Sequence, residues 1–252
     1  MRYDFVYDGT LEGLLCVIAF AVGRHVRPDT ISARYSFDGE LAVRIRPVYI
    51  RTDRDIADNF YRYIGHNAGP DCQQLIYDYF LTAADDAGIT IYDMICRSLR
   101  EGRGFTAGRD DGRIRAVRHR IRELYREAGD ELLTLLSVPV NGVEVAVTEP
   151  LGIVIPIIRE AVTGDVFSGD FLLYDRRHAL LLMRSGRDVC SFNIASDPVY
   201  RENRNETDPA AVYDLFWNRY ITAADRQRRR CREERILSDG ISGLWEIPAY
   251  CC

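Results

Sequence analysis

The chain has 252 residues, 47% of them apolar or aromatic, and a formal net charge of −5. This length and apolar content predict a folded protein with a real core and exclude an intrinsically disordered chain. No apolar run approaches the roughly 18–20 residues needed to cross a bilayer, and no basic segment with an apolar stretch opens the chain. We therefore expect a cytoplasmic protein with no membrane partner.

Several classes of chemistry are excluded by residue usage. All 33 basic residues are arginine, so neither a Schiff-base lysine nor the lysine of a phosphate-binding P-loop exists here. The seven cysteines form no C-x-x-C pair and the four histidines have no metal-ligand spacing. No nucleophile elbow, zinc-protease motif or dinucleotide-binding glycine motif occurs. We expect reduced thiols, no metal and no cofactor.

The first half of the chain shows mainly helical periodicity. Residues 2–7 predict a strand, and the apolar helix after it has Asp8 or Thr10 available as its N-cap. Residues 34–50 are poorly periodic and predict an extended segment or a short hairpin. Thr52 to Asp55 has the form of a capping box that opens the next helix. The predicted helices cover residues 10–23, 52–64, 71–84, 91–101 and 113–136.

The second half predicts strands mixed with short helices. Asn141-Gly142 is a hairpin-turn pair, and alternation follows it over residues 143–148. Asp208-Pro209 begins a final helix. The other predicted elements are a helix over residues 153–162, strands over 171–174 and 179–183 that form a hairpin or a corner, and a strand over 189–194.

These elements predict a mixed α/β (α+β) fold with a helix-rich N-terminal half and a small mixed sheet with flanking helices in the C-terminal half. We expect a single domain over residues 1–252, with a subdivision into a helical part (9–137) and a mixed part (138–252) as the alternative. If the N-terminal strand joins the later strands in one sheet, the two halves form one domain.

Positive charge is concentrated in two segments. Residues 109–126 hold seven arginines and three acids, and residues 226–235 hold six arginines and two acids, so each segment carries +4. The rest of the chain must then carry −13, because the total is −5. Segregated charge of this kind indicates a local anionic partner on an otherwise acidic protein.

Four arginines of the first segment share one face of the predicted helix over residues 113–136: Arg115, Arg118, Arg122 and Arg126. Such a row is able to follow a phosphate backbone. The alternative is a solvated face whose arginines pair with acidic neighbours, which contributes little stability.

The second segment contributes Arg226, Arg229 and Arg230 as candidate nucleic-acid contacts. Three consecutive arginines at 228–230 cannot all lie on one face of a helix, because successive residues are about 100° apart around its axis. They would wrap around it, which suits a groove or a partner.

Two carboxylates are the candidate catalytic residues. Asp8 stands where a strand meets a helix, a common ligand position in α/β folds, although an N-cap explains it as well. Asp175 begins the polar run Asp175-Arg176-Arg177-His178, which is either an ordinary turn or a phosphate-binding corner.

The start of the chain carries the motif Tyr7, Asp8, Gly9, Glu12 and Gly13. This motif resembles the start of the DUF4130 family, whose members are described as DNA metabolism or repair proteins. Further similarity lies in Thr52-Asp53, in the strand ending at residues 171–177, and in Trp217, Arg226 and Trp245 near the C-terminus. The chain resembles a divergent member of the family, since residues 127–139 lack the His-Arg pattern usual in it.

The resemblance implies a context rather than a reaction. Proteins of this family are similar to companions of a radical-SAM protein that acts in DNA modification or repair. We therefore expect an accessory protein that binds DNA, a radical-SAM partner, or both, through its arginine-rich segments. The alternatives are an enzyme acting on a nucleotide or nucleic acid near Asp8 and residues 175–177, and a protein–protein scaffold without DNA binding.

Overall fold

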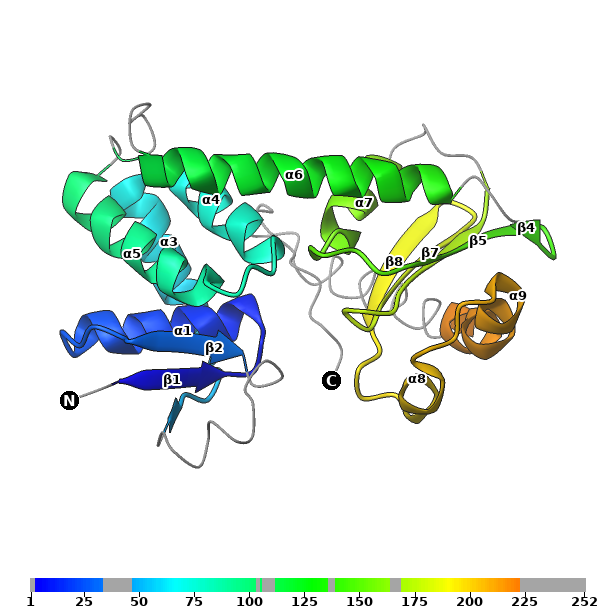
Figure 1. The fold of residues 1–252 in the computed structure, drawn as a ribbon, viewed down its shortest axis with the longest axis horizontal. Coiled ribbons are helices and arrows are strands. Elements are labelled where there is room, and N and C mark those ends of the chain that lie inside the picture. The colour runs from blue at the N-terminus through cyan, green and yellow to red at the C-terminus, as the bar shows by residue number, and fades with distance from the viewer. Residues whose placement is uncertain are drawn as a thin grey trace, which may run out of the picture. The chain divides into compact units, whose positions relative to one another are not determined.

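The structure is a computed structural model that describes residues 3–33, 47–102, 105, 112–135, 139–163 and 169–222. The chain divides into two compact units, Met1–Glu123 and Leu124–Cys252, and the boundary falls within helix α6 (Gly112–Thr134) (Figure 1). Each unit is described by itself. The fold is mixed α/β with a helix-rich N-terminal half, as the sequence predicts.

The first unit is built on a three-stranded parallel sheet. Strand β1 (Asp4–Tyr7) lies in the middle, between β2 (Thr30–Ala33) and β3 (Val48–Tyr49). Helix α1 (Leu11–Gly23) connects β1 to β2, because parallel neighbours need a crossover connection. The N-terminal strand thus pairs within its own half, and the alternative of one sheet shared with the later strands is wrong.

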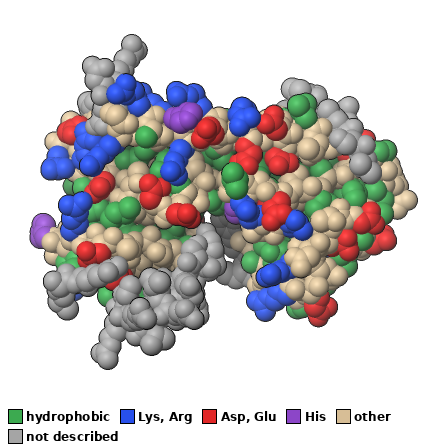
Figure 2. Space-filling view, in the orientation of Figure 1, with side chains coloured by type: hydrophobic (Ala, Val, Ile, Leu, Met, Phe, Trp, Pro, Cys, Tyr) green, Lys and Arg blue, Asp and Glu red, His purple; other side chains and the backbone are tan. Residues whose placement is uncertain are grey.

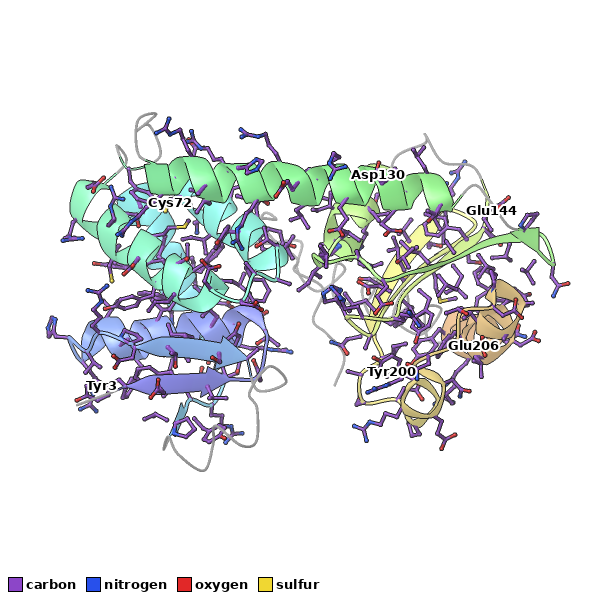
Figure 3. The ribbon with its side chains drawn as sticks, in the orientation of Figure 1. Tyr3, Cys72, Asp130, Glu144, Tyr200 and Glu206 are labelled. Carbon is purple, nitrogen blue, oxygen red and sulfur yellow. The ribbon has the colours of Figure 1, made fainter. Side chains whose placement is uncertain are left out.

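Helices α3 (Arg54–Ala68) and α5 (Ala87–Glu101) pack against α1, and α4 (Pro70–Leu81) packs against α3 and α5. Helix α1 is apolar around most of its circumference because it lies between the sheet and these helices (Figure 1). Cys72 of α4, labelled in Figure 3, is fully buried, and burial raises the pKa of its thiol. It behaves as a small core residue.

Helix α6 matches the longest periodic segment of the sequence. Its first half buries Ile114, Val117 and Ile121 in the core of the first unit. Its second half buries Leu124 and Ala128. These side chains recur at steps of three and four, which confirms the helix predicted over this segment and fixes which side chains of α6 face outward.

The second unit contains a five-stranded sheet in the order β4-β5-β6-β7-β8. The strands are β4 (Pro139–Val140), β5 (Val143–Thr148), β6 (Phe171–Asp175), β7 (Leu180–Ser185) and β8 (Asp188–Asn193). Only β5 and β6 are parallel among these neighbours, and α7 (Ile155–Val162) connects them.

The local turn predictions for this unit hold. Asn141 and Gly142 both have positive φ, 53° and 82°, which is the geometry of a two-residue hairpin turn between β4 and β5. The strands around Asp175–His178 form an antiparallel hairpin rather than a corner. Asp208 caps the helix that starts at Pro209, as expected.

One face of this sheet is covered by α9 (Pro209–Val212) and the π-helical turn η3 (Tyr213–Trp217). A further helix, α8 (Pro198–Asn203), was not predicted from the sequence. Tyr174 projects from β6 into this core, with its ring centroid 5.2 Å from that of Phe216. Its hydroxyl is buried and has no hydrogen-bond partner among the described residues.

Tyr174→Phe is expected to leave the stability of the second unit unchanged or to raise it. A buried polar group without a partner carries a desolvation cost of about 1–3 kcal/mol, and phenylalanine keeps the ring while removing that group. Tyr220→Phe is the matched control, because the Tyr220 hydroxyl donates to the carboxylate of Asp197 and its loss should be destabilising. Urea unfolding of both variants decides this; a Tyr174→Phe variant as destabilised as Tyr220→Phe would contradict it.

Candidate nucleic-acid interface and carboxylate clusters

The first half of α6 is strongly cationic. Residues 112–122 hold five arginines and no acidic residue. Four of these arginines are exposed and one, Arg118, is half-buried. Figure 2 shows arginine side chains gathered over the beginning of α6 and the neighbouring α5. We call this surface, formed by Arg113, Arg115, Arg118, Arg120 and Arg122, the α6 arginine patch.

The arginines stand at the unfavourable end of the helix. The N-terminus of a helix carries partial positive charge, so acidic residues are favoured there, yet the first turn of α6 holds none. Residues 123–134 reverse the balance with four acids and one arginine, again against the preference of the helix dipole. An anion bound at the beginning of α6 would offset this order of charges.

The predicted row of four arginines is not uniform. Arg115 and Arg122 are exposed, two turns apart on one face of the first unit. Arg118 and Arg122 line an open groove of about 390 Å³ together with Asp71 and Asp78 of α4. Arg126 belongs to the second unit and lies 3.7 Å from Asp130, an exposed pair of little energetic weight.

The other candidate arginines are placed differently. Arg176 forms an ion pair with Glu149, and its carbonyl oxygen accepts a hydrogen bond from the hydroxyl of Tyr200. Arg177 is exposed. Arg226, Arg229 and Arg230 lie outside the described residues, as does Trp245 of the family-like motif.

Asp8 joins two turns of the first unit. Its Oδ1 accepts hydrogen bonds from the backbone N–H and the hydroxyl of Thr10, and its Oδ2 accepts one from the hydroxyl of Thr52 at 2.6 Å. Thr10 is the N-cap of α1, and the N-cap of α3 is Asp53. The capping box expected at Thr52 is therefore wrong, because the Thr52 hydroxyl is engaged by Asp8.

We call Asp8, Thr10 and Thr52 the Asp8 cluster. The glycines and the tyrosine of the family-like motif surround this cluster. Tyr7 is buried at the end of β1, and Gly9 has a φ of 91°, which favours glycine. A Cβ on Gly13 would lie 2.2 Å from Asp8 Oδ1, so only glycine leaves room for the carboxylate. Glu12 lies in the first turn of α1, where an acid is favoured by the helix dipole.

Asp175 is fully buried at the end of β6 and holds the hairpin turn. Its Oδ1 accepts the backbone N–H of His178, and its Oδ2 lies 2.8 Å from His178 Nδ1. The neighbouring residue in the parallel register is Thr148, whose buried hydroxyl has no hydrogen-bond partner in the described part of the chain. Trp217, another family-like position, is a core residue stacked on Tyr213.

Asp8 and Asp175 belong to different units, so neither unit by itself assembles a pocket around both. Each carboxylate has hydrogen-bond partners that stabilise a turn. A catalytic role for either one stays a prediction.

No family model, no curated protein and no solved structure matches this chain. Within the described ranges, no helix is long and apolar enough to cross a membrane. The same residues contain no cluster of three or more histidine, cysteine, aspartate or glutamate side chains arranged to hold a metal ion.

A cavity of about 320 Å³ lies between α5 and the first half of α6. Its α5 residues were not among the predicted site residues. Their spacing was nevertheless informative: Asp86, Thr90, Asp93 and Arg97 follow one another at steps of four, three and four, which places them on one helix face.

Gly13→Ala is expected to lower the free energy of unfolding by about 1–3 kcal/mol, because the new methyl group must displace Asp8 or Thr52. This loss opposes the usual gain of up to about 1 kcal/mol when alanine replaces glycine in a helix. Gly23→Ala in the same helix is the control, since nothing lies within 4 Å of the place that its methyl group would take. Equal stability of the two variants in urea would argue against the Asp8 cluster.

The partly buried carboxyl group of Glu131 makes the stability of the second unit depend on pH. Burial raises the pKa of Glu131 above its ordinary value of 4.5, and the carboxylates of Glu127, Asp175 and Asp130 raise it further. Between 4.5 and the raised value the folded state binds more protons than the unfolded state, so stability falls as the pH rises through this window.

Glu131→Gln should therefore flatten the decline in unfolding free energy above pH 4.5, and Glu160→Gln, at an exposed position of α7, should leave it unchanged. Chemical unfolding across this pH range measures both. A decline that persists in full in the Glu131→Gln variant would contradict the account.

Proposed function

We propose that this chain binds nucleic acid through the α6 arginine patch, as an accessory protein of DNA repair or modification. The observation that carries the proposal is the run of five arginines without an acid over residues 112–122, at the end of a helix that already carries positive partial charge. Guanidinium groups keep their charge at any working pH and match the oxygens of a phosphate.

The patch is suited to the phosphate backbone rather than to one base sequence. Two of its four exposed members, Arg115 and Arg122, lie two turns apart, about 11 Å along the helix by standard geometry. That separation is compatible with contacts to phosphates of one strand, which contribute affinity and register but carry no sequence information.

The choice of DNA, and of a radical-SAM protein as the working partner, rests on the resemblance of Tyr7–Gly13 and the later motifs to the DUF4130 family. The patch supports only the binding of an anionic polymer. An acidic protein partner is the outcome that the experiment must separate from DNA.

We expect labelled single- and double-stranded DNA to bind with an affinity that falls steeply as the salt concentration rises, measured by fluorescence anisotropy. The double variant Arg115→Gln, Arg122→Gln should weaken binding uniformly across sequences and reduce the slope of log K against log salt by about 2, one unit for each lost phosphate contact.

The control is the double variant Arg187→Gln, Arg204→Gln, which removes the same charge from exposed positions of the second unit. It should bind DNA nearly as the unmodified chain does. If neither DNA binds at low salt, or if both double variants weaken binding equally, the α6 arginine patch is not a nucleic-acid interface and the scaffold alternative gains support.

A further inference from the structure

The cavity between α5 and α6 has an apolar floor. It is lined by the buried side chains of Met94, Phe105, Ile114 and Val117, with the buried ring of Tyr79 beside them. Its volume of about 320 Å³ lies at the lower end of the range of small-molecule sites, about 300–1,000 Å³. An inorganic ion alone would gain nothing from such a floor.

The rim of the same cavity carries guanidinium groups. Arg97, Arg113 and Arg120 line it, and the guanidinium of Arg97 lies 5.6 Å from the centroid of the Phe105 ring. Arg113 and Arg120 also belong to the α6 arginine patch. The cavity therefore opens within the surface that we propose to contact phosphates.

Two carboxylates complete the rim. Asp86 lies 3.5 Å from the guanidinium of Arg120 and accepts hydrogen bonds of 3.3 Å from Tyr79 and Thr90. Asp93 lies 3.9 Å from the guanidinium of Arg27. These contacts are all longer than the usual 2.7–3.2 Å, and the aspartates are well placed to exchange them for the N–H groups of a ligand.

We propose that this cavity binds a single nucleotide, with the base against the apolar floor, its N–H groups near Asp86 and Asp93, and its phosphate at the arginines. This lining is suited to a ligand that combines a planar apolar body, hydrogen-bond donors at the edge of that body and an attached anion. The inference rests on the proposed function for the source of the nucleotide, because the cavity adjoins the α6 arginine patch.

The test is calorimetric titration of the full chain with dAMP, dGMP, dCMP and dTMP at low salt, with inorganic phosphate as a separate probe. At least one nucleotide should bind at least tenfold more tightly than phosphate. Ala116→Phe should reduce that affinity at least tenfold, because Ala116 is exposed at the cavity wall and the larger ring fills the space without entering the core.

The matched control is Ala161→Phe, at an exposed helical position of α7. It should leave nucleotide binding unchanged. The proposal is overturned if no nucleotide binds more tightly than phosphate, or if Ala116→Phe and the unmodified chain bind nucleotides equally.

The same variants separate this inference from the proposed function. Ala116→Phe should retain salt-dependent binding of duplex DNA, whereas Arg115→Gln with Arg122→Gln should retain binding of the free nucleotide. Nucleotide binding without DNA binding would contradict the proposed function alone, and DNA binding without nucleotide binding would contradict the cavity alone.

A final arm identifies the source of the nucleotide. In an oligonucleotide containing 2-aminopurine, a fluorescence rise that disappears in Ala116→Phe would indicate a base withdrawn from a strand, because unstacking accompanies such extrusion. Nucleotide binding without that rise would indicate a free nucleotide. Both results retain the nucleotide chemistry of the cavity.

Discussion

Burial of the apolar stripe of α6 is the constraint on which the charged surface of the first unit depends. Ile114, Val117 and Ile121 are fixed in the core, so the rotation of the helix about its axis is set. With that rotation set, the arginines between them must face solvent or the groove and cavity beside α4 and α5. A helix free to rotate would not present a fixed array of guanidinium groups.

The elements that depend on local sequence were predictable. The period of α6, the turn at Asn141-Gly142 and the Asp208-Pro209 helix start each require only neighbours within a few residues. The parallel pairing of β1 with β2 and β3 was not predicted, because it joins segments separated by a helix or by a long connection. Short edge strands such as Val48–Tyr49 also leave almost no periodic signal.

The candidate site was also predictable only where it depends on local sequence. The charge of residues 112–122 is visible in the sequence, but the groove that half-buries Arg118 is formed with Asp71 and Asp78 of another helix. The role of Asp8 depended on the hydroxyl of Thr52, forty-four residues away, which replaced the expected capping box. The cavity could not be predicted, because it forms only where three helices meet. The regular spacing of its α5 residues, however, is visible in the sequence.

The two candidate carboxylates and the arginines of the α6 arginine patch have different roles. Asp8 and Asp175 are engaged by hydroxyls, backbone N–H groups and a histidine, and these bonds stabilise turns at the ends of strands. The patch on α6 has an arrangement that opposes the helix dipole and that an external anion would relieve. The proposed binding of nucleic acid at the patch, with a nucleotide in the adjoining cavity, is consistent with this division.

The most direct measurement is protection of individual arginines from phenylglyoxal by bound DNA, read by mass spectrometry. The absence of lysine makes arginine the one strongly basic side chain to be modified. The account predicts that DNA protects Arg115 and Arg122 strongly and leaves Arg187 reactive. Equal reactivity of Arg115 and Arg122 with and without saturating DNA would contradict it.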